Sequence, residues 1–192
     1  EADMQTVRGE RVAMIFQNAM SALNPVQTVG EQVAETLRLH TSLRGGALRQ
    51  RDMQLFAEVG IQSPDERYGF YPHQLSGGQQ QRVMIAMALA CEPDILIADE
   101  PTTALDVTIQ QQVLALIRGL TRSRQLAVLL ITHDMGVVRN TADEVAVMYR
   151  GEIIERAPVD TFFRNPKEAY SRRLIEALPD LTNFHSTFEG EA

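Results

Sequence analysis

The alternation of apolar and polar positions along the chain predicts a mixture of strands and helices. Short apolar runs of strand length occur at residues 11–17, 94–98, 127–132 and 144–149. Apolar residues recur with helical spacing at residues 28–43, 47–59, 82–90, 107–122 and 135–140. Because strands and helices alternate after residue 94, the pattern predicts a parallel sheet, continued to residue 149, with crossover helices.

Turn signals divide these elements. The glycines at 45–46 separate the first two helices, and residues 63–74, with two prolines and three aromatic residues, are expected to form a loop. Residues 150–151 are expected to form a hairpin turn into a strand at 152–155. Residues 159–178 are predicted to form two short helices that break near the Asn-Pro pair at 165–166.

Composition and charge narrow the class of protein. The 192 residues, 44% hydrophobic and 22% charged, are typical of a globular domain with room for a subdomain. The net charge of −7 gives no sign of a basic nucleic-acid-binding surface. The single cysteine, Cys91, excludes an intrachain disulfide framework, fits a reducing compartment and is expected to be a small buried hydrophobe.

No apolar run approaches the roughly 18 residues needed to span a bilayer. Residues 1–9 are polar and do not resemble a signal peptide. If the protein serves transport, we therefore expect other chains to form the pore.

The first chemical signal is the run Ser76-Gly77-Gly78-Gln79 ahead of the helical pattern at residues 82–90. Free backbone N–H groups, a hydroxyl and the positive end of a helix suit an anion such as phosphate.

The second signal is the pair Asp99-Glu100, which closes the apolar strand at residues 95–98. Parallel α/β sheets bind ligands at the carboxyl ends of their strands. Without its neighbours, an Asp-Glu pair could equally cap the turn before Pro101.

These two signals in this order, with Gln17 upstream and His133 downstream, resemble the nucleotide-binding subunits of ATP-binding cassette (ABC) transporters over residues 7–179. The resemblance implies an α/β, P-loop NTPase-like (RecA-like) ATPase core with a helical signature subdomain, and ATP and Mg²⁺ as cofactors. It implies that Asp99 holds Mg²⁺ and that Glu100 polarises the attacking water, a division that suits phosphoryl transfer.

The same resemblance assigns three more residues. Gln17 matches the glutamine that binds Mg²⁺ or its water, and His133 matches the switch histidine that contacts the γ-phosphate. Alone, Gln17 would be an ordinary surface residue and His133 a structural one. Asp106, in Thr103-Ala104-Leu105-Asp106, matches the aspartate at the junction of two ATPase subunits, and it is also suited to cap the helix that begins at Val107.

Ser76, Gly77, Gly78 and Gln79 match the signature that closes over the partner's ATP, so the resemblance implies a dimer or a tandem cassette. A Gly-x-x-x-x-Gly-Lys-Ser/Thr stretch is missing, and the only lysine is Lys167. We therefore expect truncation at the amino end, with the P-loop before Glu1, and no ATP hydrolysis by these residues alone. The expected domains are residues 1–27 and 91–156 of the core, 28–90 of the helical subdomain and a carboxyl-terminal helical extension at 157–192.

The segment Ser21-Ala22-Leu23-Asn24-Pro25 resembles the oligopeptide, dipeptide and glutathione import ATPases. This implies two membrane-spanning permease subunits, indirectly a solute-binding protein, no nucleic acid, and a peripheral location on the cytoplasmic face of the plasma membrane. Because a cysteine is missing after residues 170–179, the sequence is compatible with a parent of two cassettes as well as with one of a single cassette. The alternatives are a non-transport ABC ATPase acting on nucleic acid or ribosomes, and a regulatory cassette that never turns over.

Overall fold

The computed structural model describes residues 7, 9–17, 19–103 and 105–178, and the chain divides into two units, residues 1–131 and 132–192. Each unit is described by itself. Within the described residues, no helix combines the length and the apolar character that crossing a bilayer requires.

The first unit is built on a parallel sheet of three strands in the order β1-β2-β3. The strands are β1 (Val12–Ile15), β2 (Ile95–Asp99) and β3 (Ala127–Ile131). In the register, Ile15 lies opposite Ala98, and Asp99 lies opposite Ile131. Alternate residues of β1 and β2 are buried, as the period-two geometry of strands requires. The parallel sheet predicted from the pattern is therefore confirmed for these strands.

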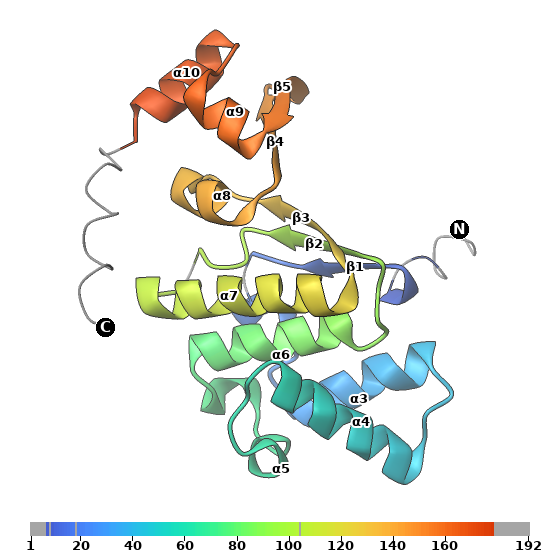
Figure 1. Ribbon diagram of the computed structural model, residues 1–192. Coiled ribbons are helices and arrows are strands. Elements are labelled where there is room, and N and C mark those ends of the chain that lie inside the picture. The colour runs from blue at the N-terminus through green and yellow to red at the C-terminus, as the bar shows by residue number, and fades with distance from the viewer. Residues whose placement is uncertain (1–6, 8, 18, 104, 179–192) are drawn as a thin grey trace, which may run out of the picture. The chain divides into compact units, whose positions relative to one another are not determined.

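Two helices, α6 (Gly77–Leu89) and α7 (Val107–Arg124), lie beneath the sheet in Figure 1. Val83, Ile85 and Leu89 of α6 are almost completely buried in the hydrophobic core. The sequence predicts this helix only from residue 82, but it begins at Gly77. The reason is a capping box, in which Ser76 and Gln79 satisfy each other's backbone N–H groups.

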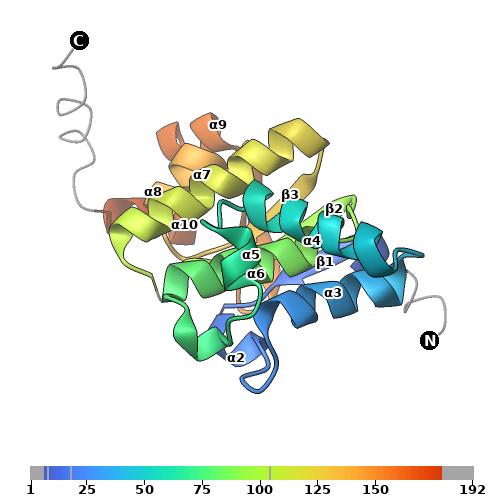
Figure 2. The same ribbon diagram turned by 90° about the horizontal axis from the view of Figure 1, so that it is seen from below.

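The helical segment of the first unit lies next to α6 and is seen from below in Figure 2. Its elements are α2 (Ala19–Ala22), α3 (Val29–His40), α4 (Gly45–Glu58), α5 (Pro64–Arg67) and the 3₁₀ helix η1 (Pro72–Gln74). Thr28 begins α3 with a second capping box. The two glycines at 45–46 form the first turn of α4 instead of preceding it, and the predicted loop at 63–74 contains two short helices.

Asp52 is a buried carboxylate that the helical pattern did not predict. It lies in α4 with no exposed surface, and the hydroxyl of Tyr68 donates a hydrogen bond to Asp52 Oδ2 at 3.0 Å. The ring of Tyr68 packs against Gly30, and a Cβ added at Gly30 would lie only 2.3 Å from this ring. A glycine is therefore required at that position of α3.

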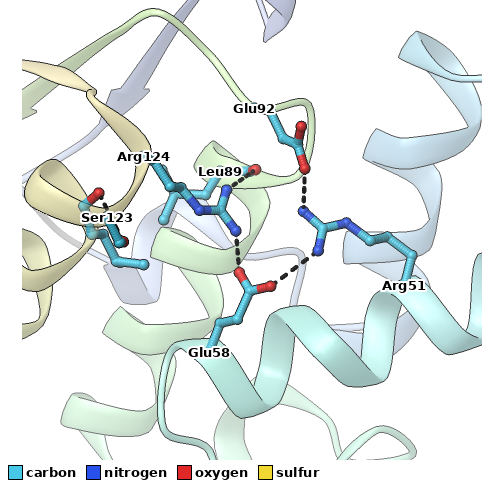
Figure 3. Close-up of polar contacts among 7 residues, drawn as sticks. Arg51, Glu58, Leu89, Glu92, Ser123 and Arg124 are labelled. Carbon is cyan, nitrogen blue, oxygen red and sulfur yellow. Dashed lines mark hydrogen bonds and ion pairs between the residues drawn. The ribbon is translucent and has the colours of Figure 1, made fainter.

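An ion-pair network joins α4 to the ends of α6 and α7 (Figure 3). Glu58 accepts hydrogen bonds from Arg51 Nη1 at 3.0 Å and from Arg124 Nη2. Arg51 Nη2 also donates to Glu92 at 2.9 Å, and Arg124 Nη1 donates to the carbonyl oxygen of Leu89 at 3.3 Å. These residues line a cleft of about 340 Å³. The network therefore joins α4 to the carboxyl-terminal ends of α6 and α7. Ser76 and Asp106 lie at the opposite, amino-terminal ends of these two helices.

The second unit contains α8 (Met135–Thr141), β4 (Glu144–Tyr149), β5 (Glu152–Pro158), α9 (Val159–Arg164) and α10 (Ala169–Glu176). The prediction that residues 144–149 continue the parallel sheet is wrong. Within the described chain, β4 pairs antiparallel with β5, with Val145 opposite Ala157. The turn between them, with positive φ at Arg150 and Gly151, offers β4 a local partner that the alternation of elements does not reveal.

The two short carboxyl-terminal helices and the hairpin turn are confirmed, although β5 runs three residues further than predicted. The domain boundaries expected at residues 27, 90 and 156 stay predictions.

Candidate functional site

The candidate site begins at the carboxyl edge of the parallel sheet. Gln17 follows β1 by two residues, Asp99 ends β2, and Glu100 comes next. Glu100 has a φ of 44°, a left-handed conformation that is rare for a residue with a side chain. Its N–H donates to the carbonyl oxygen of Ile131 at 2.8 Å, which anchors this strained residue to the end of β3. The sheet thus fixes the backbone of Glu100.

One oxygen of the Glu100 side chain accepts hydrogen bonds from Gln17 and from Thr103. Gln17 Nε2 donates to Glu100 Oε2 at 2.6 Å, and Thr103 Oγ1 donates to the same oxygen at 2.9 Å. Gln17 and Glu100, which the sequence analysis assigned to one site, are therefore in direct contact. Because a carboxylate only accepts hydrogen bonds, the amide nitrogen of Gln17 faces Glu100, and the amide oxygen is the end that Glu100 does not use.

The oxygen atoms at this edge suit Mg²⁺. This ion prefers carboxylate and carbonyl oxygens, keeps several waters, and is usually bound by one or two carboxylates together with phosphates. The carboxylates of Asp99 and Glu100 and the amide oxygen of Gln17 are donors of this kind. The assignment of Asp99 and Gln17 to Mg²⁺ stays a prediction, and a cluster of three or more His, Cys, Asp or Glu residues is not found among the described residues.

The segment after Glu100 is a compact turn. Pro101 and Thr102 are buried, and the N–H of Thr103 donates to the carbonyl oxygen of Glu100 at 3.3 Å. Asp106 then caps α7, because its Oδ1 accepts from the N–H of Ile109 at 3.0 Å. The capping role suggested for Asp106 is present, and its place at a subunit junction stays a prediction.

The signature residues form the amino terminus of α6. Ser76 Oγ accepts from the N–H of Gln79 at 3.4 Å, and Gln79 Oε1 accepts from the N–H of Ser76 at 3.0 Å. Gly78 is buried, and a Cβ on it would stand 2.6 Å from Ile109 of α7, whereas Gly77 is exposed. Gly78 therefore lets α6 and α7 approach closely, a structural reason for this glycine besides any contact with phosphate.

His133 belongs to the second unit and is exposed. The next residue, Asp134, caps α8, since its Oδ1 accepts from the N–H groups of Gly136 and Val137 at 2.9 and 3.1 Å. The contact of His133 with a γ-phosphate stays a prediction.

The sequence analysis missed the hydrogen bond from Thr103 to Glu100. It identified the surrounding segment only through Asp106. The sequence did contain a hydroxyl-bearing residue three positions after the second carboxylate. A tight turn brings the side chains of two residues at this spacing close together.

Comparison with known proteins agrees with this geometry. A family model described as ABC transporter matches residues 1–103. A structure of an ATP-binding cassette, solved as a dimer in a post-hydrolysis state bound to ADP and Pi, has a TM-score of 0.72 and 29% sequence identity, and the match covers 83% of this chain and 67% of that one. The expected P-loop NTPase-like α/β core is thereby confirmed.

Curated relatives are more similar in sequence. The peptidoglycan transport ATP-binding protein YejF of Agrobacterium fabrum is 50% identical over 93% of this chain and 33% of its own length. The oligopeptide transport ATP-binding protein OppD of Lactococcus lactis is 50% identical over 92% of this chain and 52% of its own. The glutathione import ATP-binding protein GsiA of Escherichia coli K12 is 52% identical over 94% of this chain and 29% of its own.

The chain thus spans about half, or less, of the length of these relatives. The family match extends over more than half of the 192 residues and includes Gln17, the signature residues, Asp99 and Glu100. This chain belongs to the ABC transporter family.

Proposed function

We propose that the protein containing this chain is the ATP-binding subunit of an ABC importer and couples ATP hydrolysis to the uptake of peptides or glutathione. The observation that carries the proposal is the contact between Gln17 and Glu100 at the carboxyl edge of the sheet. The names of the relatives, which concern oligopeptide, peptidoglycan and glutathione transport, support the substrate class.

In this proposal, Glu100 orients and polarises the water that attacks the γ-phosphate. Asp99 and Gln17 hold Mg²⁺, which supplies charge neutralisation at the phosphates when it is bound. His133 donates a hydrogen bond to the γ-phosphate, a task that an imidazole performs when its other nitrogen is fixed by a neighbour.

The proposal also requires a second ATPase cassette. The amino terminus of α6 offers backbone N–H groups and the hydroxyl of Ser76 to the ATP of the partner, with Gly77, Gly78 and Gln79 in the same turn. Asp106 lies at the junction of the two cassettes. Two permease subunits form the pore, a solute-binding protein delivers the solute, and the ATPase sits on the cytoplasmic face of the membrane.

The 192 residues contain no P-loop. A P-loop wraps backbone N–H groups around the phosphates and adds a lysine that reaches the β- and γ-oxygens. We therefore expect the 192-residue chain by itself to show no ATP turnover.

The experiment uses the complete ATP-binding protein, reconstituted with its two permease subunits in proteoliposomes. We expect Mg-ATP hydrolysis stimulated by peptide or by glutathione, and we expect Glu100→Gln to reduce the rate at least about 100-fold, within the range that general base catalysis contributes. Glu66→Gln is the matched control, because Glu66 is an exposed glutamate of α5. Unchanged hydrolysis by Glu100→Gln would contradict the proposal.

A further inference from the structure

We infer that Thr103 is a positioning residue that holds Glu100 in its working orientation. The inference rests on the proposed ATPase function and adds to it a residue that acts through Glu100 and does not itself touch nucleotide.

The contact is direct and polar. Thr103 Oγ1 donates to Glu100 Oε2 at 2.9 Å, on the same oxygen that accepts from Gln17 Nε2 at 2.6 Å. Thr103 is exposed, so its side chain adds little to the core. The hydrogen bond of its hydroxyl to Glu100 is therefore the main interaction of the Thr103 side chain that the structure describes.

The backbone around Thr103 keeps its hydroxyl in place. The buried Pro101 and Thr102 separate it from Glu100, and the N–H of Thr103 donates to the carbonyl oxygen of Glu100 at 3.3 Å. The N–H of Leu105 donates to the carbonyl oxygen of Thr102 at 3.1 Å, which continues the turn. A threonine side chain is also stiff, because it branches at Cβ. Donor and acceptor thus belong to one hydrogen-bonded turn.

The two donors on Glu100 differ in origin. Gln17 comes from the loop after β1, and its amide is expected to serve Mg²⁺ as well. Thr103 belongs to the same turn as Glu100, so it keeps hold of Oε2 when the amide of Gln17 turns to another partner. Because a glutamate has three rotatable side-chain bonds, a hydroxyl that fixes one oxygen also restricts where the other can lie.

The test compares Thr103→Val, Thr103→Ala and Thr103→Ser in the complete ATP-binding protein with its permeases. We expect Thr103→Val and Thr103→Ala to lower kcat about tenfold, the effect of one lost hydrogen bond to a charged group, while KM for Mg-ATP stays within about twofold. Thr103→Ser keeps the hydroxyl and should restore kcat. Thr36→Val, which removes a hydroxyl in α3, is the control and should leave both constants unchanged.

A second measurement asks whether Thr103 acts through Glu100. In single-turnover experiments on Glu100→Gln, the addition of Thr103→Val should change the residual rate by less than about twofold, because the positioned base is already gone. A tenfold further loss would show an independent role and overturn the inference. So would normal kcat in Thr103→Val, or failure of Thr103→Ser to restore it.

These results separate the inference from the proposed function. If Glu100→Gln abolishes hydrolysis and Thr103→Val does not slow it, only the role of Thr103 is refuted. If the unmodified protein does not hydrolyse ATP, or Glu100→Gln does so at the full rate, the proposed function fails and the inference falls with it.

Discussion

Replacement of Glu58 by glutamine tests the ion-pair network of Figure 3. Glu58 accepts from Arg51 Nη1 at 3.0 Å and from Arg124 Nη2, and the two arginine side chains are only 17% and 21% exposed. Glutamine keeps the size of the side chain and removes its charge. Arg51 retains Glu92, whereas Arg124 loses its carboxylate partner among the described residues.

The expected loss follows from these contacts. A hydrogen bond to a charged group contributes about 1.5–3 kcal/mol when it is buried. The side chain of Glu58 is 34% exposed, so solvent screens both of its bonds, and we expect a combined loss of about 2 kcal/mol in the free energy of unfolding. Glu92→Gln is the matched control: its side chain is 73% exposed, and we expect a loss below about 0.5 kcal/mol.

The assay uses Cys91, the single cysteine, which is half-buried in the first unit. Burial, followed by the carboxylates of Glu10 and Glu92, raises the pKa of its thiol and slows labelling of the folded protein. Thiol labelling in increasing urea therefore reports the unfolding of this unit alone, which matters because a chain of two units need not unfold in one step.

With an m-value of about 2 kcal/mol per molar urea, Glu58→Gln should lower the midpoint by about 1 M. Added salt should shrink the difference without abolishing it, because the pair is partly buried. Equal midpoints for Glu58→Gln, Glu92→Gln and the unmodified chain would refute the reasoning.

Two further predictions concern buried positions of the first unit. Gly78→Ala should destabilise this unit by about 1–3 kcal/mol in the Cys91 assay, because its Cβ would stand 2.6 Å from Ile109. Gly77→Ala should not destabilise the unit, because its Cβ would make an ordinary contact. Equal effects of the two substitutions would contradict the packing role of Gly78. Burial raises the pKa of Asp52 above its ordinary value of 3.8, and the hydrogen bond from Tyr68 lowers it less, so the folded chain binds this proton more tightly than the unfolded chain. The stability that this protonated carboxyl contributes is fully present below the pKa of the unfolded chain and is lost as the pH rises through the pKa of the folded chain. Asp52→Asn should therefore remove this pH dependence from urea midpoints measured between about pH 4 and 8. An unchanged pH profile in Asp52→Asn would count against this explanation.

Much of the first unit could be predicted from the sequence because its signals are local. Apolar spacing located the strands and the long helices, and a serine, two glycines and a glutamine were recognised as a motif just ahead of the helical pattern that belongs to α6. The sequence pattern placed that start five residues late, since Gly77 and Gly78 carry no apolar side chain and the capping box that stabilises them is a matter of hydrogen bonds.

Other features depend on tertiary contacts or on the shape of a turn. The turn signal at residues 150–151 predicted the hairpin, but periodicity did not show that β4 pairs antiparallel with β5 instead of continuing a parallel sheet. Asp52 sits among helical residues, where an aspartate is usually exposed, and its burial and its hydrogen bond from Tyr68 depend on tertiary packing. The hydrogen bond from Thr103 to Glu100 could not be predicted because it depends on the conformation of the turn after Glu100.

The hydrogen bond between Gln17 and Glu100 has a consequence for the order of folding. It joins positions 83 residues apart, and the helices α3, α4 and α6 lie between them in the chain. Such a long loop must close before this contact can form, so the local helices can form first. During synthesis at the ribosome, β1 cannot pair with β2 until residues 95–99 emerge, so Ala13 and Ile15 form their contacts with that strand late. The carboxyl edge that carries Gln17 and Glu100 is thus expected to be among the last parts of the first unit to assemble.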